Sequence, residues 1–232
     1  MDKLQKYKPT DKMIDLIGDN YSLLQVMSRF GLSLGFGDKT VKEVCEMNNV
    51  DCQTFLVVVN FMAEGFSRMD GSADDISIPA LVDYLRQAHI YFLDYCLPAI
   101  RRKLIEAIDC SQDDVSFLIL KFFDGYMREV RKHMEYEEKT VFKYVDTLIH
   151  GNAPKNYQIS TFSKHHDQVG ERLTELKNII IKYCPAKANT NVLNAALFDI
   201  YACEEGLESH CKVEDYLFVP AILKLERRMR EN

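Results

Sequence analysis

The chain of 232 residues has no tryptophan, only ten glycines and six prolines, and no long apolar run. The scarcity of turn residues, together with the absence of a strand–turn–strand signal, argues against an all-β protein. No apolar segment approaches the roughly 18 residues that a transmembrane helix needs. The opening MDKLQKYKPTDK is polar where a signal peptide would be apolar. We therefore expect a helical protein that is neither exported nor embedded in a membrane.

Cysteine occurs seven times, but the number is odd and no C-x-x-C motif is present. This pattern favours reduced thiols, so we expect a cytoplasmic location. The formal net charge of -6 argues against a nucleic-acid-binding protein, because phosphate contacts need a basic face. A hydrophobic content of 47% is typical of a globular chain with a sizeable core.

The polar segment RMDGSADDISIP, residues 68–79, predicts a linker between two domains. Before it, residues 1–67 predict a small domain of short helices. Thr40 and Glu43 form a predicted capping box, and Gly65 is predicted to end the last of these helices. After it, residues 80–232 predict a larger domain. Helical periodicity over about 78–107, 112–149, 157–183 and 190–230 gives four long helices. Their short connections favour an all-α, up-down-up-down four-helix bundle.

The inward stripe of each long helix is apolar except at one level. The interruptions are His89 on the first helix, His133 and Glu137 on the second, His166 on the third, and His210 and Glu214 on the fourth. Residues four apart share a helix face, so each His-x-x-x-Glu directs an imidazole and a carboxylate into the core. Two buried carboxylates repel each other, and no Lys or Arg lies on these stripes. A metal is the expected counter-charge.

Four imidazoles and two carboxylates suit two metal ions that share the carboxylates as bridges. Mixed nitrogen and oxygen ligands with open positions suit iron or manganese better than structural zinc. The motif E-x-x-H of ferritin-like proteins and the motif H-E-x-x-H of metalloproteases are both absent. The alternative is a helical interaction protein with hydrogen-bonded core histidines, because about one His-x-x-x-acid match is expected by chance.

The segments HIYFLDYCLP, HMEYEEKTVF, HHDQVGERL and SHCKVEDYLFVPAI together resemble the hemerythrin-like fold. More narrowly, they resemble the RIC family of di-iron proteins, which repair iron–sulfur clusters after oxidative or nitrosative stress. The resemblance covers residues 80–226. The ligands that it implies are the six residues of the stripes: His89, His133, Glu137, His166, His210 and Glu214.

From this resemblance we expect two non-haem iron ions. One is assigned to His89 and His210, the other to His133 and His166, and both are bridged by Glu137 and Glu214. Hydrogen bonds from Tyr126 and Tyr144 are expected to tune the site.

Three positions depart from the related families. Oxygen-carrying hemerythrins have a fifth histidine where Gly170 stands here, which favours reactive chemistry or small-molecule access over oxygen carriage. The adjacent cysteine pair of the RIC family would fall near Gly35 and Phe36, and neither residue is cysteine. Cys45 and Cys52 are not expected to replace that pair, because neither has an adjacent partner in the sequence.

The resemblance implies repair of iron–sulfur clusters, or the handling of iron and nitric oxide under stress, and leaves enzymatic activity undecided. The alternative is an oxygen- or nitric-oxide-binding sensor that signals through its N-terminal domain. The expected partners are oxygen or nitric oxide as small ligands and iron–sulfur proteins, with neither nucleic acid nor membrane. A monomer and a homodimer both stay open.

Overall fold

The computed structural model describes residues 6–64, 76–108, 114–152, 157–164, 171–185 and 188–231. These residues form helices and connecting turns with no strand among them, which confirms the all-α prediction. None of the described helices combines the length and apolar character needed to cross a bilayer. Two compact units are present, Met1–Ala88 with Lys212–Asn232 and His89–Cys211. The domain limits at 67 and 80 stay a prediction.

Four short helices open the first unit: α1 (Met13–Asp19), α2 (Leu23–Arg29), α3 (Val41–Met47) and α4 (Cys52–Glu64). The Glu43 N–H donates to the Thr40 hydroxyl at 3.3 Å, and the Thr40 N–H donates to the Glu43 carboxylate at 2.8 Å. The predicted capping box is therefore confirmed. Phe30 packs edge-on against Phe55 in the small core, with ring centroids 5.4 Å apart. The predicted stop at Gly65 lies outside the described residues.

Helix α5 (Ile78–Ile90) begins inside the segment predicted as a linker. Pro79 lies in its first turn, where a missing backbone N–H removes no helical hydrogen bond. Ile78 and Pro79 therefore belong to the helix, whose start was predicted at about residue 78. Residues 65–75 lie outside the described part of the chain.

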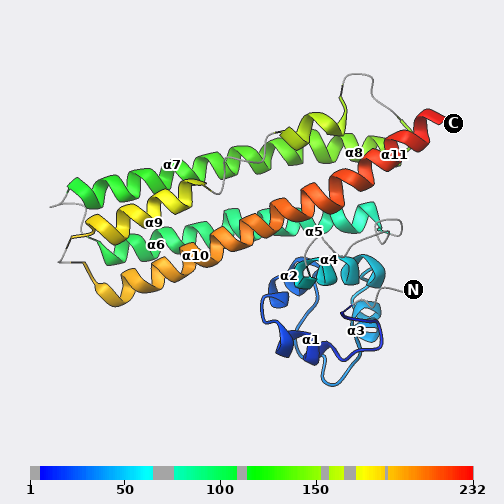
Figure 1. Ribbon diagram of the computed structural model, residues 1–232, viewed down its shortest axis with the longest axis horizontal. Coiled ribbons are helices and arrows are strands. Elements are labelled where there is room, and N and C mark those ends of the chain that lie inside the picture. The colour runs from blue at the N-terminus through cyan, green and yellow to red at the C-terminus, as the bar shows by residue number, and fades with distance from the viewer. Residues whose placement is uncertain are drawn as a thin grey trace. The chain divides into compact units, whose positions relative to one another are not determined.

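Four helical runs follow along the chain (Figure 1). They are α5, η3 (Tyr91–Cys96) and α6 (Leu97–Ala107); α7 (Asp114–Tyr136), η4 (Glu137–Val141) and α8 (Phe142–Ile149); η5 (Ile159–Lys164) and α9 (Glu171–Tyr183); and α10 (Thr190–Val213), η7 (Glu214–Phe218) and α11 (Val219–Glu231). The third run opens with a 3₁₀ segment where an α-helix was predicted. The other described ends lie close to the predicted ones.

In the unit His89–Cys211, the helices α6, α7, α9 and α10 lie side by side as a bundle (Figure 1). An ion pair joins each neighbouring pair in a closed ring: Arg101–Asp124, Glu129–Arg172, Lys177–Glu204 and Asp199–Lys103. Exposed ion pairs add little stability. Buried apolar side chains such as Phe92, Phe123 and Leu176 hold the bundle together, and the ion pairs mark which helices are neighbours.

Candidate metal centre

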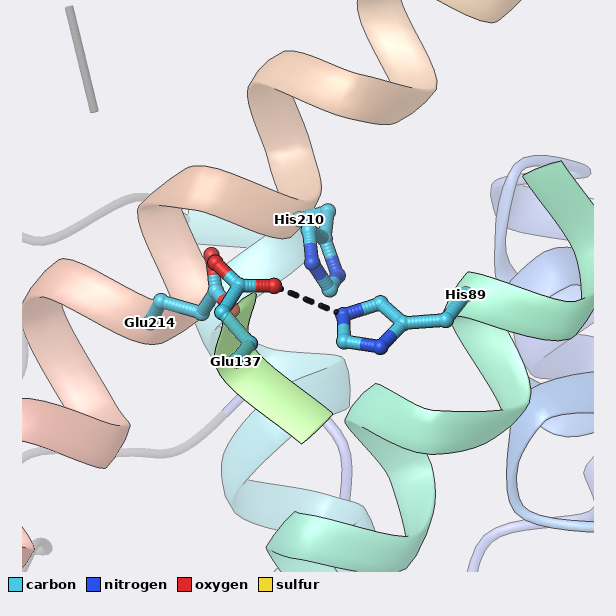
Figure 2. A group of neighbouring side chains, drawn as sticks. All are labelled: His89, Glu137, His210 and Glu214. Atoms are coloured by element: carbon cyan, nitrogen blue, oxygen red, sulfur yellow. Dashed lines mark ion pairs between the residues drawn. The ribbon is translucent and has the colours of Figure 1, made fainter. Parts of the chain in front are cut away.

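Four of the predicted ligands gather at one level of the helical core (Figure 2). His89 lies in α5, Glu137 begins η4 and His210 lies in α10, while Glu214 begins η7 one turn after His210. All four side chains are buried, and each offers one donor atom within 4.8 Å of the others. Two imidazoles and two carboxylates therefore converge on one space.

The carboxylate of Glu137 lies between two histidines from different helices. Its Oε2 is 3.0 Å from Nε2 of His89, and its Oε1 is 2.9 Å from Nε2 of His133. His133 is one helical turn before Glu137 and retains 14% side-chain exposure. Each oxygen of the carboxylate thus faces a different imidazole, which is the arrangement that a bridging carboxylate requires.

The second ring nitrogen of His89 has its own carboxylate partner. Nδ1 lies 2.9 Å from Oε1 of Glu138, whose side chain is 36% exposed. The His89 ring is also stacked on Phe142 at a centroid distance of 5.5 Å and an interplanar angle of 11°. A carboxylate on Nδ1 favours the tautomer that leaves the Nε2 lone pair available to a metal. Glu138 and Phe142 therefore orient Nε2 toward Glu137.

His210 approaches the same space from α10. Its ring meets that of His89 edge-on at a centroid distance of 5.1 Å and an angle of 69°. Phe92 lies edge-on to His210 on another side at 6.1 Å. The two imidazoles that were assigned to one ion are therefore neighbours, in an aromatic and apolar surrounding.

Three helices carry a π-helical segment at this level. The segments η3, η4 and η7 begin two residues after His89, at Glu137 and at Glu214, respectively. A π turn accommodates one extra residue and so rotates the following side chains relative to the preceding ones. Each helix can therefore direct its ligand residue inward at this level, while its apolar residues before and after this level still face the core.

The donor set fits a metal ion. Glu137 and Glu214 are fully buried, and burying two carboxylates is costly unless a cation compensates their charge. Imidazole nitrogen and carboxylate oxygen suit iron, manganese or zinc, and the group contains no thiolate to favour closed tetrahedral zinc. His133 offers a further nitrogen donor, because its Nε2 lies beside Oε1 of Glu137, the oxygen that does not face His89.

Two predicted features of the third helix are not placed by the structure. His166, the sixth predicted ligand, lies outside the described residues, as does Gly170. The structure therefore brings together His89, Glu137, His210 and Glu214, sets His133 against Glu137, and leaves the assignment of His166 as a prediction.

The hydrogen bond expected from Tyr126 is not found among the described residues, so its role at the site stays a prediction. Its hydroxyl is buried and has no hydrogen-bond partner among the described residues. It lies near Cys96 and Cys203, and burial raises its pKa far above the ordinary value. Tyr144 packs edge-on against Tyr157, with ring centroids 4.8 Å apart.

The role of Glu138 was missed by the sequence patterns. Glu138 directly follows Glu137, so its position on the helix points away from the inward stripe. Its reach to His89 depends on the neighbouring helix, which no periodicity reveals. The run of two glutamates after the tyrosine in HMEYEE was the only signal available.

Comparison with known families identifies the larger part of the chain. A model of the hemerythrin HHE cation-binding domain matches residues 80–222. No curated protein matches the chain. The matched segment is more than half of the 232 residues and contains all six predicted ligands. With its cluster of buried histidines and glutamates, the chain is a metal-binding, hemerythrin-like protein, and it belongs to the hemerythrin HHE cation-binding domain family.

Proposed function

We propose that the chain holds two non-haem iron ions bridged by carboxylates and serves in iron–sulfur cluster repair under oxidative or nitrosative stress. The observation that carries the proposal is the position of Glu137. Its two oxygens face imidazoles on two different helices, at 3.0 Å and 2.9 Å. A single ion would need only one side of this carboxylate, whereas a pair of ions uses both.

In this proposal, His89 and His210 would hold one ion, and His133 and His166 would hold the other. Glu137 and Glu214 would be shared between the two ions. The edge-on contact of the His89 and His210 rings supports the first pair, and the separate oxygen that faces His133 supports a second position. The donors are nitrogen and oxygen, which favours iron over a closed structural zinc site.

The protein's own residues prepare the site. When bound, a pair of iron ions can change between ferrous and ferric states, and so supplies or accepts electrons. Glu138 holds the Nδ1 proton of His89 and so keeps Nε2 directed inward. Phe92 and Phe142 shield the two imidazoles from water. A dry, oriented ligand set preserves the metal while small molecules such as oxygen or nitric oxide can reach it.

The proposal is tested first by metal analysis of purified wild-type protein and the Glu214→Ala variant. We expect two irons per wild-type chain, with charge-transfer absorption in the near ultraviolet and visible range, and loss of both in the variant. A wild-type protein that holds one zinc, or no metal, contradicts the di-iron assignment. The cluster-repair role needs a second assay, in which iron-loaded protein restores an apo iron–sulfur protein. Failure of that transfer with two irons bound removes the repair role alone.

A second candidate function is the binding or sensing of oxygen or nitric oxide. Gly35 and Phe36 stand where the RIC family would have its cysteine pair. Gly35 adopts φ +89°, a left-handed conformation that favours glycine, and Phe36 is a buried core residue. These positions are therefore occupied for structural reasons. A reversible spectral change with oxygen or nitric oxide, without transfer of iron, would favour this second function.

A further inference from the structure

The small N-terminal helices pack against α5, the helix that carries His89. Tyr84 lies in the middle of α5 and is 1% exposed. Its hydroxyl accepts a hydrogen bond from Nη1 of Arg29 at 3.2 Å, and its ring centroid lies 4.9 Å from that of Phe30. Arg29 is the last residue of α2, and Phe30 follows it. Helix α2 therefore holds Tyr84 through both a hydrogen bond and a ring contact.

A second connection fixes the place where α5 begins. The Ser77 N–H donates to the hydroxyl oxygen of Thr54 at 2.8 Å, and Thr54 is fully buried in α4. The Ser77 carbonyl accepts from the Leu81 N–H at 3.0 Å and so starts the helical hydrogen bonding of α5. An α-helix has a fixed rise and rotation per residue. Anchoring its first turn and Tyr84 therefore also sets the position of His89, five residues after Tyr84.

Helix α4 also contacts the element that carries Glu214. Phe61 of α4 packs against Tyr216 of η7, with ring centroids 6.1 Å apart. Phe61 is 4% exposed, and Tyr216 comes two residues after Glu214. The contacts of α2 and α4 with α5 and η7 all lie within the compact unit of Met1–Ala88 with Lys212–Asn232. Two helices without any predicted ligand thus pack against two elements that each carry one.

We propose that α2 and α4 position the metal ligands, and that Tyr84 and Phe61 are the positioning residues through which they act. The inference rests on the proposed metal site, because it needs His89 and Glu214 as ligands. Metal–ligand distances tolerate errors of only about 0.2 Å. A small shift of α5 or η7 therefore weakens binding, and packing by α2 and α4 prevents that shift before the metal binds.

This coupling acts in both directions. If the packing of α2 and α4 strengthens metal binding, then metal binding strengthens that packing by the same free energy. Backbone amides of α2 and α4 that exchange without global unfolding should therefore exchange more slowly in metal-loaded than in metal-free wild-type protein. Helices that served only to fold the small domain would exchange at the same rate in both forms.

The test measures the affinity of the full-length protein for ferrous iron by anaerobic chelator competition. We expect Phe61→Leu and Tyr84→Phe each to bind iron about 3- to 30-fold more weakly than wild type. Two controls accompany them. Val44→Ala shortens a buried side chain of α3 and lowers the stability of the small domain, and Tyr21→Phe removes the hydroxyl of a tyrosine that is 81% exposed. Both controls should bind iron as tightly as wild type.

The possible results separate this inference from the proposed function. A wild-type protein that binds no iron contradicts the proposed metal site, and the positioning role with it. Unchanged affinity in folded Phe61→Leu and Tyr84→Phe overturns the positioning role alone and leaves the metal site in place.

Two further results also overturn the positioning role. An equal loss of affinity in Val44→Ala would show that affinity follows the stability of the small domain rather than the contacts of Phe61 and Tyr84. Identical amide exchange of α2 and α4 with and without metal would show that the coupling is absent. The exchange measurement uses wild-type protein, so it decides the question even where a variant does not fold.

Discussion

The helices of the bundle carry two polar levels that occupy equivalent helical positions. His89, His133 and His210 belong to the first level, and Cys96, Tyr126 and Cys203 to the second. Each residue of the second level is seven positions from its counterpart on the same helical run, which is about two α-helical turns in α7 and α10, whereas η3 lies between His89 and Cys96. The backbone therefore offers similar inward positions at both levels, and residue type sets the chemistry of each.

At the histidine level the buried groups are strong metal donors, accompanied by the carboxylates of Glu137 and Glu214. At the thiol level the Cys96 and Cys203 side chains hydrogen-bond each other. That contact and burial raise the pKa of Cys203 well above its ordinary value, and burial does the same for Tyr126. The thiol level is thus kept uncharged and packs as core, whereas the histidine level needs a cation.

The largest expected effect comes from removing the central carboxylate. In Glu137→Ala, neither imidazole faces a bridging oxygen, so we expect nearly complete loss of bound metal. Metal analysis after dialysis checks this, with Tyr126→Phe at the thiol level as the matched control. Full metal content in Glu137→Ala would mean that the carboxylate does not bind metal. Loss of metal in the control would remove the distinction between the levels.

A smaller effect is expected from the residue that orients His89. In Glu138→Ala, Nδ1 of His89 loses its partner at 2.9 Å, and metal affinity should fall about 10- to 100-fold. Glu138→Gln retains an acceptor oxygen and should recover most of the affinity. Chelator competition measures the change. Glu135→Ala is the control, because Glu135 pairs with Lys139 on the exposed face of the same helix. An unchanged affinity in Glu138→Ala contradicts the orienting role.

Packing at the thiol level should affect stability without affecting metal content. Cys203→Ala removes a buried sulfur and leaves a small cavity, so we expect a loss of about 1–2 kcal/mol in the free energy of unfolding. Urea denaturation of the metal-free protein measures this, and metal analysis of the loaded variant should match wild type. A variant that keeps its stability but loses metal would show that the thiols serve the metal centre.

The smallest effect is a difference in alkaline stability. The raised folded-state pKa of Tyr126 means that its contribution is fully present below the unfolded value of 10.0 and is lost as pH rises through the folded value. Tyr126→Phe removes an ionisable group, and its unfolding free energy should decline less above about pH 10. At neutral pH it should be as stable as wild type or more so, because the hydroxyl has no partner within the described residues. Parallel pH profiles would contradict this assignment.

Much of this architecture follows from local patterns. The capping box at Thr40 depends on two residues that are three apart in the sequence. The apolar periodicity predicted helix ends such as Ala107 and Ile149, because each helix must bury one face along its whole length. The polar breaks in those stripes predicted His89, Glu137, His210 and Glu214, and the fold brings these four together. The π-helical segments could not be predicted, because they depend on how the helices fit at the ligand level.

The sequence by itself determined which residues enter the core, because a fixed helical period and the cost of burying charge act on every residue locally. Only the tertiary structure decided which inward groups meet. It set the two oxygens of Glu137 against two imidazoles and brought Glu138 to His89. It also closed a ring of ion pairs between neighbouring helices, such as Arg101–Asp124 and Lys103–Asp199. Such contacts depend on the packing of separate helices, and no sequence spacing encodes that packing directly.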